Sequence, residues 1–132
     1  FFKSKDGWVV CKEEQIKEWS AIAYFTSKAI FESKNIAVGI IACYQGASVI
    51  ESWVPEGAFN KIGINIPIED KHCDHTNYKK WNSDGVLYEY ALSQIKPFSL
   101  SAIVWYQGES DTSIAEGKVY FDELKELINS FG

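Results

Sequence analysis

Two short polar loops hold the residues of this chain that are best suited to chemistry. Residues 45–48 read QGAS and follow an apolar run, and residues 107–111 read QGESD directly after the run IVWY. Each loop offers a glutamine, a glycine and a serine. A glutamine amide has two N–H donors, and a glycine lets its own N–H approach a ligand closely. Donors that converge in this way can stabilise an oxyanion.

The two serines of these loops are weak candidates for a nucleophile. Ser48 and Ser110 each follow a glycine by two positions, which is the first half of a G-x-S-x-G elbow. Ile50 and Thr112 stand where the second glycine of the elbow should be. That turn is strained and needs the small residue, so we predict no catalytic nucleophile within this chain.

A histidine-rich stretch raises the question of a metal. His72 and His75 flank Cys73 and Asp74 in the segment EDKHCDH, and side chains three apart share a face of a helix. The segment falls in a stretch without periodicity, however, and catalytic zinc takes three protein ligands. We therefore predict solvated polar residues here, and no metal or other cofactor. A zinc protein remains a third hypothesis, which predicts bound metal that a chelator removes. These are the only histidines, so an imidazole base must be one of them or lie outside the chain.

The elements that must position the two loops alternate along the chain. Helical spacing of apolar residues predicts helices over 20–35, 85–95 and 118–131, the first capped by Ser20 and ended by Asn35. Continuous apolar, β-rich runs predict buried strands over 36–43 and 101–106. Residues 57–83 read as a long irregular excursion.

This alternation predicts a single α/β domain over residues 1–132, with a three-layer parallel sheet and flanking helices. Ligands bind at the carboxyl ends of parallel strands, which is where both polar loops fall.

Composition excludes several classes of function. The chain has 132 residues, 46% of them hydrophobic, and a net charge of -5, so it offers no basic face for nucleic acid. No apolar run approaches the roughly 18 residues that a membrane helix needs, and no signal peptide is visible. Three cysteines allow at most one disulfide, which favours a reducing compartment such as the cytoplasm.

The chain contains no methionine, even at its first position. We therefore expect it to be an internal piece of a longer protein. A sheet that lacks a strand has an open edge, so we also expect a tendency to self-associate.

The motifs resemble one known group. VWYQGESD resembles the W-Y-Q-G-E-[SA]-[ND] block of the sialate O-acetylesterase and acetylxylan esterase group, within the SGNH-hydrolase superfamily. A second block of the group, W-G-G-T-x-I-E-A-W, is similar to QGASVIESW. The group's helix-then-strand lead-in is similar to EWSAIAYFTSKAI, which precedes VGII. The group's connecting helix is similar to GVLYEYALSQIKPFSL. Nearly the whole chain resembles the group, in the same order. The QGES block is fairly specific, and the others corroborate it.

The resemblance implies a serine esterase that removes acetyl groups from sugars, in the parent protein. The group carries its nucleophile in an N-terminal G-Q-S-N block and its Asp-His pair in a C-terminal D-x-x-H block, and neither occurs in this chain. The chain alone is therefore predicted to be inactive. The implied oxyanion hole is Gly46 and Gln107, the active-site loop residues are Ser48, Gly108 and Glu109, and Trp53 is a substrate contact.

Two departures affect the first block. Gln45 replaces a tryptophan of the group, and Ala47 replaces its second glycine. If that glycine needs a positive φ, Ala47 is strained or the loop is reshaped.

The alternative function is a non-catalytic carbohydrate-binding or scaffold domain, in which Trp53, Trp81, Trp105 and the 57–83 loop supply stacking surfaces.

Overall fold

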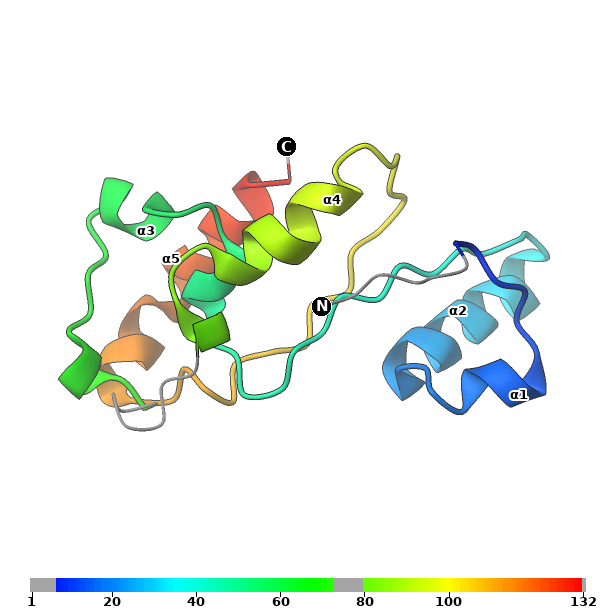
Figure 1. The fold of residues 1–132 in the computed structure, drawn as a ribbon, viewed down its shortest axis with the longest axis horizontal. Coiled ribbons are helices and arrows are strands. Elements are labelled where there is room, and N and C mark those ends of the chain that lie inside the picture. Colours follow the sequence, from blue (N-terminus) through cyan, green and yellow to red (C-terminus); the bar gives the residue numbers. More distant parts are fainter. Residues whose placement is uncertain (1–6, 73–79, 132) are drawn as a thin grey trace. The chain divides into compact units, whose positions relative to one another are not determined.

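The computed structural model describes residues 7–72 and 80–131. The chain divides into two compact units, Phe1–Tyr44 and Gln45–Gly132 (Figure 1). Each unit is described by itself below.

The first unit is built on a predicted helix. Helix α1 spans Glu13–Ile16 and α2 spans Ala21–Lys34. The Ser20 side chain accepts a hydrogen bond from the N–H of Ala23 at the start of α2, and Asn35 ends the helix in the left-handed conformation with φ 52°. Both caps are the residues predicted from the sequence, and this helix is confirmed. None of the described residues in 7–44 is buried.

The second unit holds the buried core. Its elements are η1 (Ile50–Trp53), α3 (Ala58–Lys61), η2 (Ile68–Asp70), η3 (Lys80–Asn82), η4 (Tyr88–Leu92), α4 (Ser93–Ile95) and α5 (Ile114–Asn129). The short helix η1 contacts α5, η3 and η4. The buried apolar side chains are those of Val49, Ile50, Trp53, Val54, Ala58, Phe59, Leu87, Ala91, Leu92 and Leu127. The segment that follows the first polar loop is thus the centre of this unit.

The predicted parallel sheet is wrong for the described residues. Residues 36–43 and 101–106 are without regular secondary structure, and no strand occurs in 7–72 or 80–131. An apolar, β-branched segment becomes a strand only when a neighbour hydrogen-bonds to its backbone N–H and C=O groups. Within its own unit, neither segment makes a backbone hydrogen bond of this kind with the described residues. The sequence pattern specifies that a segment prefers the extended conformation, but a strand also requires a second segment to pair with.

The two later helices also differ from the prediction in detail. The helix over 85–95 contains a π-helical turn, η4, before α4. Leu87, just before this turn, and Ala91, within it, are buried, whereas Tyr90 is 56% exposed. Helix α5 begins at Ile114, four residues before the predicted start, because Ser113 and Glu116 form a capping box. None of the helices in the described residues is long and apolar enough to cross a membrane.

Candidate functional site

The two polar loops lie against each other in the second unit. The side chain of Gln107 donates from Nε2 to the carbonyl oxygen of Ser48 at 2.8 Å. The same Nε2 donates to the carboxylate of Asp111. The loops are 59 residues apart in sequence, and this single amide joins them. The two loops are therefore in contact, although no sheet occurs in the described residues to bring them together.

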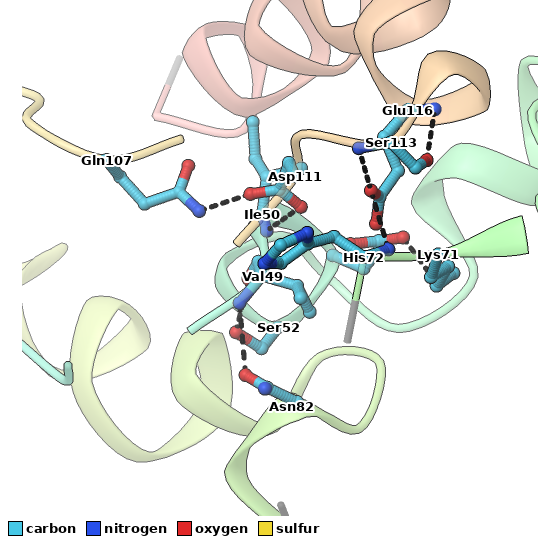
Figure 2. Close-up of polar contacts among 11 residues, drawn as sticks. Val49, Ile50, Ser52, Lys71, His72, Asn82, Gln107, Asp111, Ser113 and Glu116 are labelled. Atoms are coloured by element: carbon cyan, nitrogen blue, oxygen red, sulfur yellow. Dashed lines mark hydrogen bonds and ion pairs between the residues drawn. The ribbon is translucent and has the colours of Figure 1, made fainter. Parts of the chain in front are cut away.

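Buried polar side chains hold the backbone that follows the first loop. Asn82 accepts from the N–H of Val49 at 3.0 Å and donates to the carbonyl of Ala47 at 2.9 Å. Asp111 accepts from the N–H of Ile50 at 3.2 Å (Figure 2). Asn82 and Asp111 are only 1% and 4% exposed. Residues 47–50 are thus fixed from two sides by side chains that replace the partners a sheet would supply.

The second loop is held by an aromatic hydroxyl. Tyr120 on α5 places its hydroxyl 2.9 Å from Gln107 Oε1 and 3.0 Å from the Gln107 carbonyl, and it accepts from the indole N–H of Trp105 at 3.3 Å. Gly108 has φ 138°, and a Cβ there would lie 3.3 Å from this hydroxyl. Position 108 therefore requires glycine for its conformation, and a side chain would crowd the tyrosine.

Several carboxyl groups lie close to these loops. Glu51 forms an ion pair with Lys71 at 2.5 Å, and Glu116 accepts from the N–H groups of Ser113 and His72. Glu123 is 1% exposed, and neither of its carboxyl oxygens has a hydrogen-bond partner among the described residues. Among the described residues only Lys71 is paired with these carboxyls, and its single charge does not neutralise the cluster.

Burial and mutual repulsion shift the protonation of two of these acids. Desolvation raises the pKa of Asp111 to about 6, against the opposing hydrogen bonds from Gln107 and Ile50. Desolvation, followed by the negative charges of Glu51 and Asp111, raises the pKa of Glu123 to about 8. Glu123 is therefore mostly protonated at neutral pH, which lets a buried carboxyl without partners remain in the core.

The predicted oxyanion residues differ in how their donors are used. Gly46 is exposed, and its N–H makes no hydrogen bond with the described residues, so this donor is available to a ligand. The two amide hydrogens of Gln107 go to Ser48 and Asp111. An oxyanion contact from Gln107 would have to replace one of these bonds. The role of both residues stays a prediction.

The other predicted site residues are distributed between core and surface. Ser48 is buried, and its hydroxyl accepts from the indole N–H of Trp53 at 3.0 Å. Trp53 is 3% exposed and packs edge-to-face on Trp105, with ring centroids 6.0 Å apart. Sugar stacking on Trp53, in either functional hypothesis, would require this indole to leave its packing. Glu109 is exposed and open to a ligand.

The departure at Ala47 has the consequence expected from the sequence. Ala47 has φ 54°, in the left-handed region that disfavours a residue with a Cβ. Gln45, the other departure, donates from its side chain to the carbonyl of Gly46 at 3.2 Å. The loop keeps a conformation suited to glycine, although alanine occupies it.

The histidine segment lies mostly outside the described residues. Cys73, Asp74 and His75 are among residues 73–79, which the structure leaves undescribed. His72 is exposed, and its backbone N–H, not its ring, donates to Glu116. The described residues contain no group of three acidic, histidine or cysteine side chains placed to hold a metal. The absence of a metal and of a cofactor remains a prediction.

Sequence reasoning did not find the residues that position the loops. Asn82 and Glu123 carry no motif, and Tyr120 lies within the helix predicted over 118–131 without a role of its own. One signal was present, because Glu116, Tyr120, Glu123 and Leu127 recur at helical spacing on α5. Two acids within such a stripe indicate a polar function for the buried face of this helix.

Comparison with known proteins supports the resemblance over part of the chain. Residues 72–132 match the family model of carbohydrate esterases described as sialic acid-specific acetylesterase. The match covers somewhat less than half of the chain and includes the second polar loop, Tyr120 and the whole of α5. It confirms the predicted similarity to sialate O-acetylesterases. No curated protein and no solved structure matches the chain.

Proposed function

We propose, from the carbohydrate esterase family that residues 72–132 match, that this chain is the central part of a carbohydrate O-acetylesterase. The reaction is acyl transfer: a serine outside this chain attacks the acetyl carbonyl, and a histidine outside it relays the proton. The two polar loops supply the surroundings of the oxyanion. The proposed enzyme is an SGNH-type serine esterase. Its proposed substrates are acetylated sugars, including acetylated xylan and acetylated sialic acid.

The observation that carries the proposal is the contact between the loops. Gln107, within the matched segment, bonds to the carbonyl of Ser48, so the 45–48 and 107–111 loops are in contact. In the first loop, the N–H of Gly46 is a donor without a partner among the described residues. A preorganised donor of this kind typically lowers an acyl-transfer barrier by about 3–4 kcal/mol.

The division of the site between this chain and its flanks can be tested directly. The reading frame on both sides is sequenced, and the longer protein and the 132-residue chain are each assayed for acetate release from an O-acetylated sialic acid and from acetylated xylan. We expect a G-Q-S-N block upstream, a D-x-x-H block downstream, hydrolysis by the longer protein and none by the isolated chain.

Two results would contradict the proposal. Serine-dependent hydrolysis by the isolated chain would place the nucleophile within these residues. A longer protein that carries both blocks but binds the sugars without hydrolysis would favour the carbohydrate-binding domain instead. Replacing the serine of the G-Q-S-N block by alanine is the matched control, because it removes hydrolysis without changing either loop.

A further inference from the structure

The side-chain amide of Gln107 uses both of its hydrogens within the second unit. Its Nε2 donates to the carbonyl oxygen of Ser48 at 2.8 Å and to Oδ2 of Asp111, and Figure 2 shows the bond to Asp111. Its Oε1 lies 2.9 Å from the hydroxyl of Tyr120. A backbone carbonyl and an ionised carboxylate only accept, so they fix which way the amide faces. A ligand that needs a donor from Gln107 must therefore displace one of them.

The two acceptors of this amide differ in what can release it. The Ser48 carbonyl lies in a backbone segment that Asn82 holds on both sides, through the carbonyl of Ala47 and the N–H of Val49. This carbonyl accepts at every pH. The capacity of Asp111 depends on its charge, because a protonated carboxyl carries an O–H donor. Asp111 is thus the acceptor that a proton can change.

Asp111 cannot turn away from Gln107. Its backbone N–H donates to the carbonyl of Gly108 at 3.1 Å, its Oδ1 accepts from the N–H of Ile50 at 3.2 Å, and it is only 4% exposed. The N–H of Ile50 belongs to buried backbone, whereas the Gln107 amide ends a half-buried side chain that can adjust. A protonated Asp111 therefore keeps its carbonyl oxygen on Ile50 and carries the proton on Oδ2. That O–H then faces an N–H of Gln107, and two donors form no bond with each other.

The charges around Asp111 favour its uptake of a proton. The titratable groups at and around it come from η1, residues 71–72 and α5, and they are Glu51, Lys71, His72, Glu116, Tyr120 and Glu123. Lys71 is already paired with Glu51. Burial first, and the negative charges of Glu51 and Glu116 in addition, raise the pKa of Asp111 to about 6. Neutralising Asp111 relieves this repulsion.

We propose that Asp111 is a positioning residue that holds one amide hydrogen of Gln107 while it is ionised and releases that hydrogen to a ligand when it takes up a proton. In this step a proton from solvent bonds to Oδ2, and the hydrogen bond between Nε2 and Oδ2 breaks. The inference rests on the proposed function, in which Gln107 donates to the oxyanion of an acetyl ester. An ionised Asp111 repels that oxyanion, whereas a protonated one leaves both a free donor and no opposing charge.

The amide resonances of Gln107 report this exchange in the 132-residue chain itself. The two side-chain protons, assigned by their loss in Gln107→Glu, are followed by 15N-resolved NMR from about pH 4 to about pH 8. In the wild type, one of them should move upfield as pH falls through about 6, because it loses a charge-assisted hydrogen bond. The exposed Gln15 is the internal reference.

Two variants show which group causes the change. Asp111→Asn presents an N–H where the protonated acid presents its O–H, so it should show no such step at any pH. Asp122→Asn, an exposed acid on α5, is the matched control and should titrate like the wild type. Wild-type amide protons that do not change with pH, or a step that persists in Asp111→Asn, would overturn the proposal. The wild-type measurement does not depend on the folding of any variant.

Hydrolysis by the longer protein tests the use of the released donor. Asp111→Asn is neutral at every pH, whereas wild-type Asp111 is almost entirely ionised at pH 8. The ratio of the variant's kcat to that of the wild type should therefore rise about tenfold or more from pH 6 to pH 8, with KM unchanged. A structural role alone would give a constant ratio, which would overturn this role of Asp111. If the amide step is found but the longer protein does not hydrolyse acetylated sugars, the proposed function fails and the exchange at Gln107 stands.

Discussion

Two neighbouring regions of the second unit differ in how their backbone is satisfied. Residues 47–50 are buried or held by Asn82, Asp111 and Gln107, whereas residues 99–106 make no backbone hydrogen bond with the described residues. Both regions have apolar, β-branched sequences. The difference is that polar side chains hydrogen-bond to the backbone of residues 47–50, whereas none among the described residues does so to the backbone of residues 99–106. Local order around the candidate site therefore depends on buried amides and carboxyls rather than on a sheet.

The sharpest test of this contrast is the same substitution in each region. Ile50 is 0% exposed and Ile103 is 49% exposed. Ile50→Ala should lower the free energy of unfolding by about 2–5 kcal/mol, since it leaves a cavity in the core. Ile103→Ala should cost less than about 1 kcal/mol. Urea denaturation at low protein concentration measures both.

Equal losses of stability in the two isoleucine variants would contradict the difference between the two regions. Such a result would mean that residues 101–106 are as firmly packed as η1 in the folded chain. The urea dependence of each variant also reports on this, because a change of slope indicates altered surface exposure on unfolding rather than lost packing alone.

The buried amide of Asn82 is the next largest contribution. Asn82→Leu keeps the approximate volume but leaves the N–H of Val49 and the carbonyl of Ala47 without partners. We expect a loss of about 2–3 kcal/mol in the free energy of unfolding, because an unpaired buried polar group carries its full desolvation cost. Asn60→Ala, an exposed asparagine on α3, is the control and should change stability little. A neutral result for Asn82→Leu would show that water replaces the amide.

Prediction from sequence succeeded where the determinants are local. The helix over 20–35 was found with both caps, because Ser20 and Asn35 act on adjacent backbone groups. The contact between the two loops depends on Gln107, a residue 59 positions away from Ser48, rather than on the predicted sheet. The sheet failed because strand pairing depends on distant partners that local pattern cannot supply.

The buried acids make the second unit sensitive to pH. The pKa of Glu123 is about 8 in the folded chain against an ordinary 4.5, and that of Asp111 is about 6 against 3.8. The folded state therefore binds these protons more tightly than the unfolded state. Their contribution to stability is complete below about pH 4 and is lost as pH rises through about 6 for Asp111 and about 8 for Glu123.

Glu123→Gln removes the larger of these two contributions. The amide resembles the protonated acid, so the variant should match the wild type near pH 4 and exceed its free energy of unfolding near pH 8, where the wild type must ionise or bury a charge. Urea denaturation across this range is the measurement. Asp122→Asn, on the exposed side of the same helix, should show no such divergence. Parallel curves for Glu123→Gln and the wild type would mean that Glu123 is ionised in the folded chain.

The smallest expected effect concerns the strained alanine of the first loop. Ala47 has φ 54°, and glycine reaches this conformation without the Cβ clash. Ala47→Gly should raise the free energy of unfolding by about 0.5–1 kcal/mol, since relief of strain exceeds the added entropy of the unfolded chain. Ala115→Gly, within α5, is the matched control and should have the opposite sign. If both substitutions destabilise equally, the loop has relaxed around Ala47, and the bonds from Asn82 and Gln107 hold a backbone without strain.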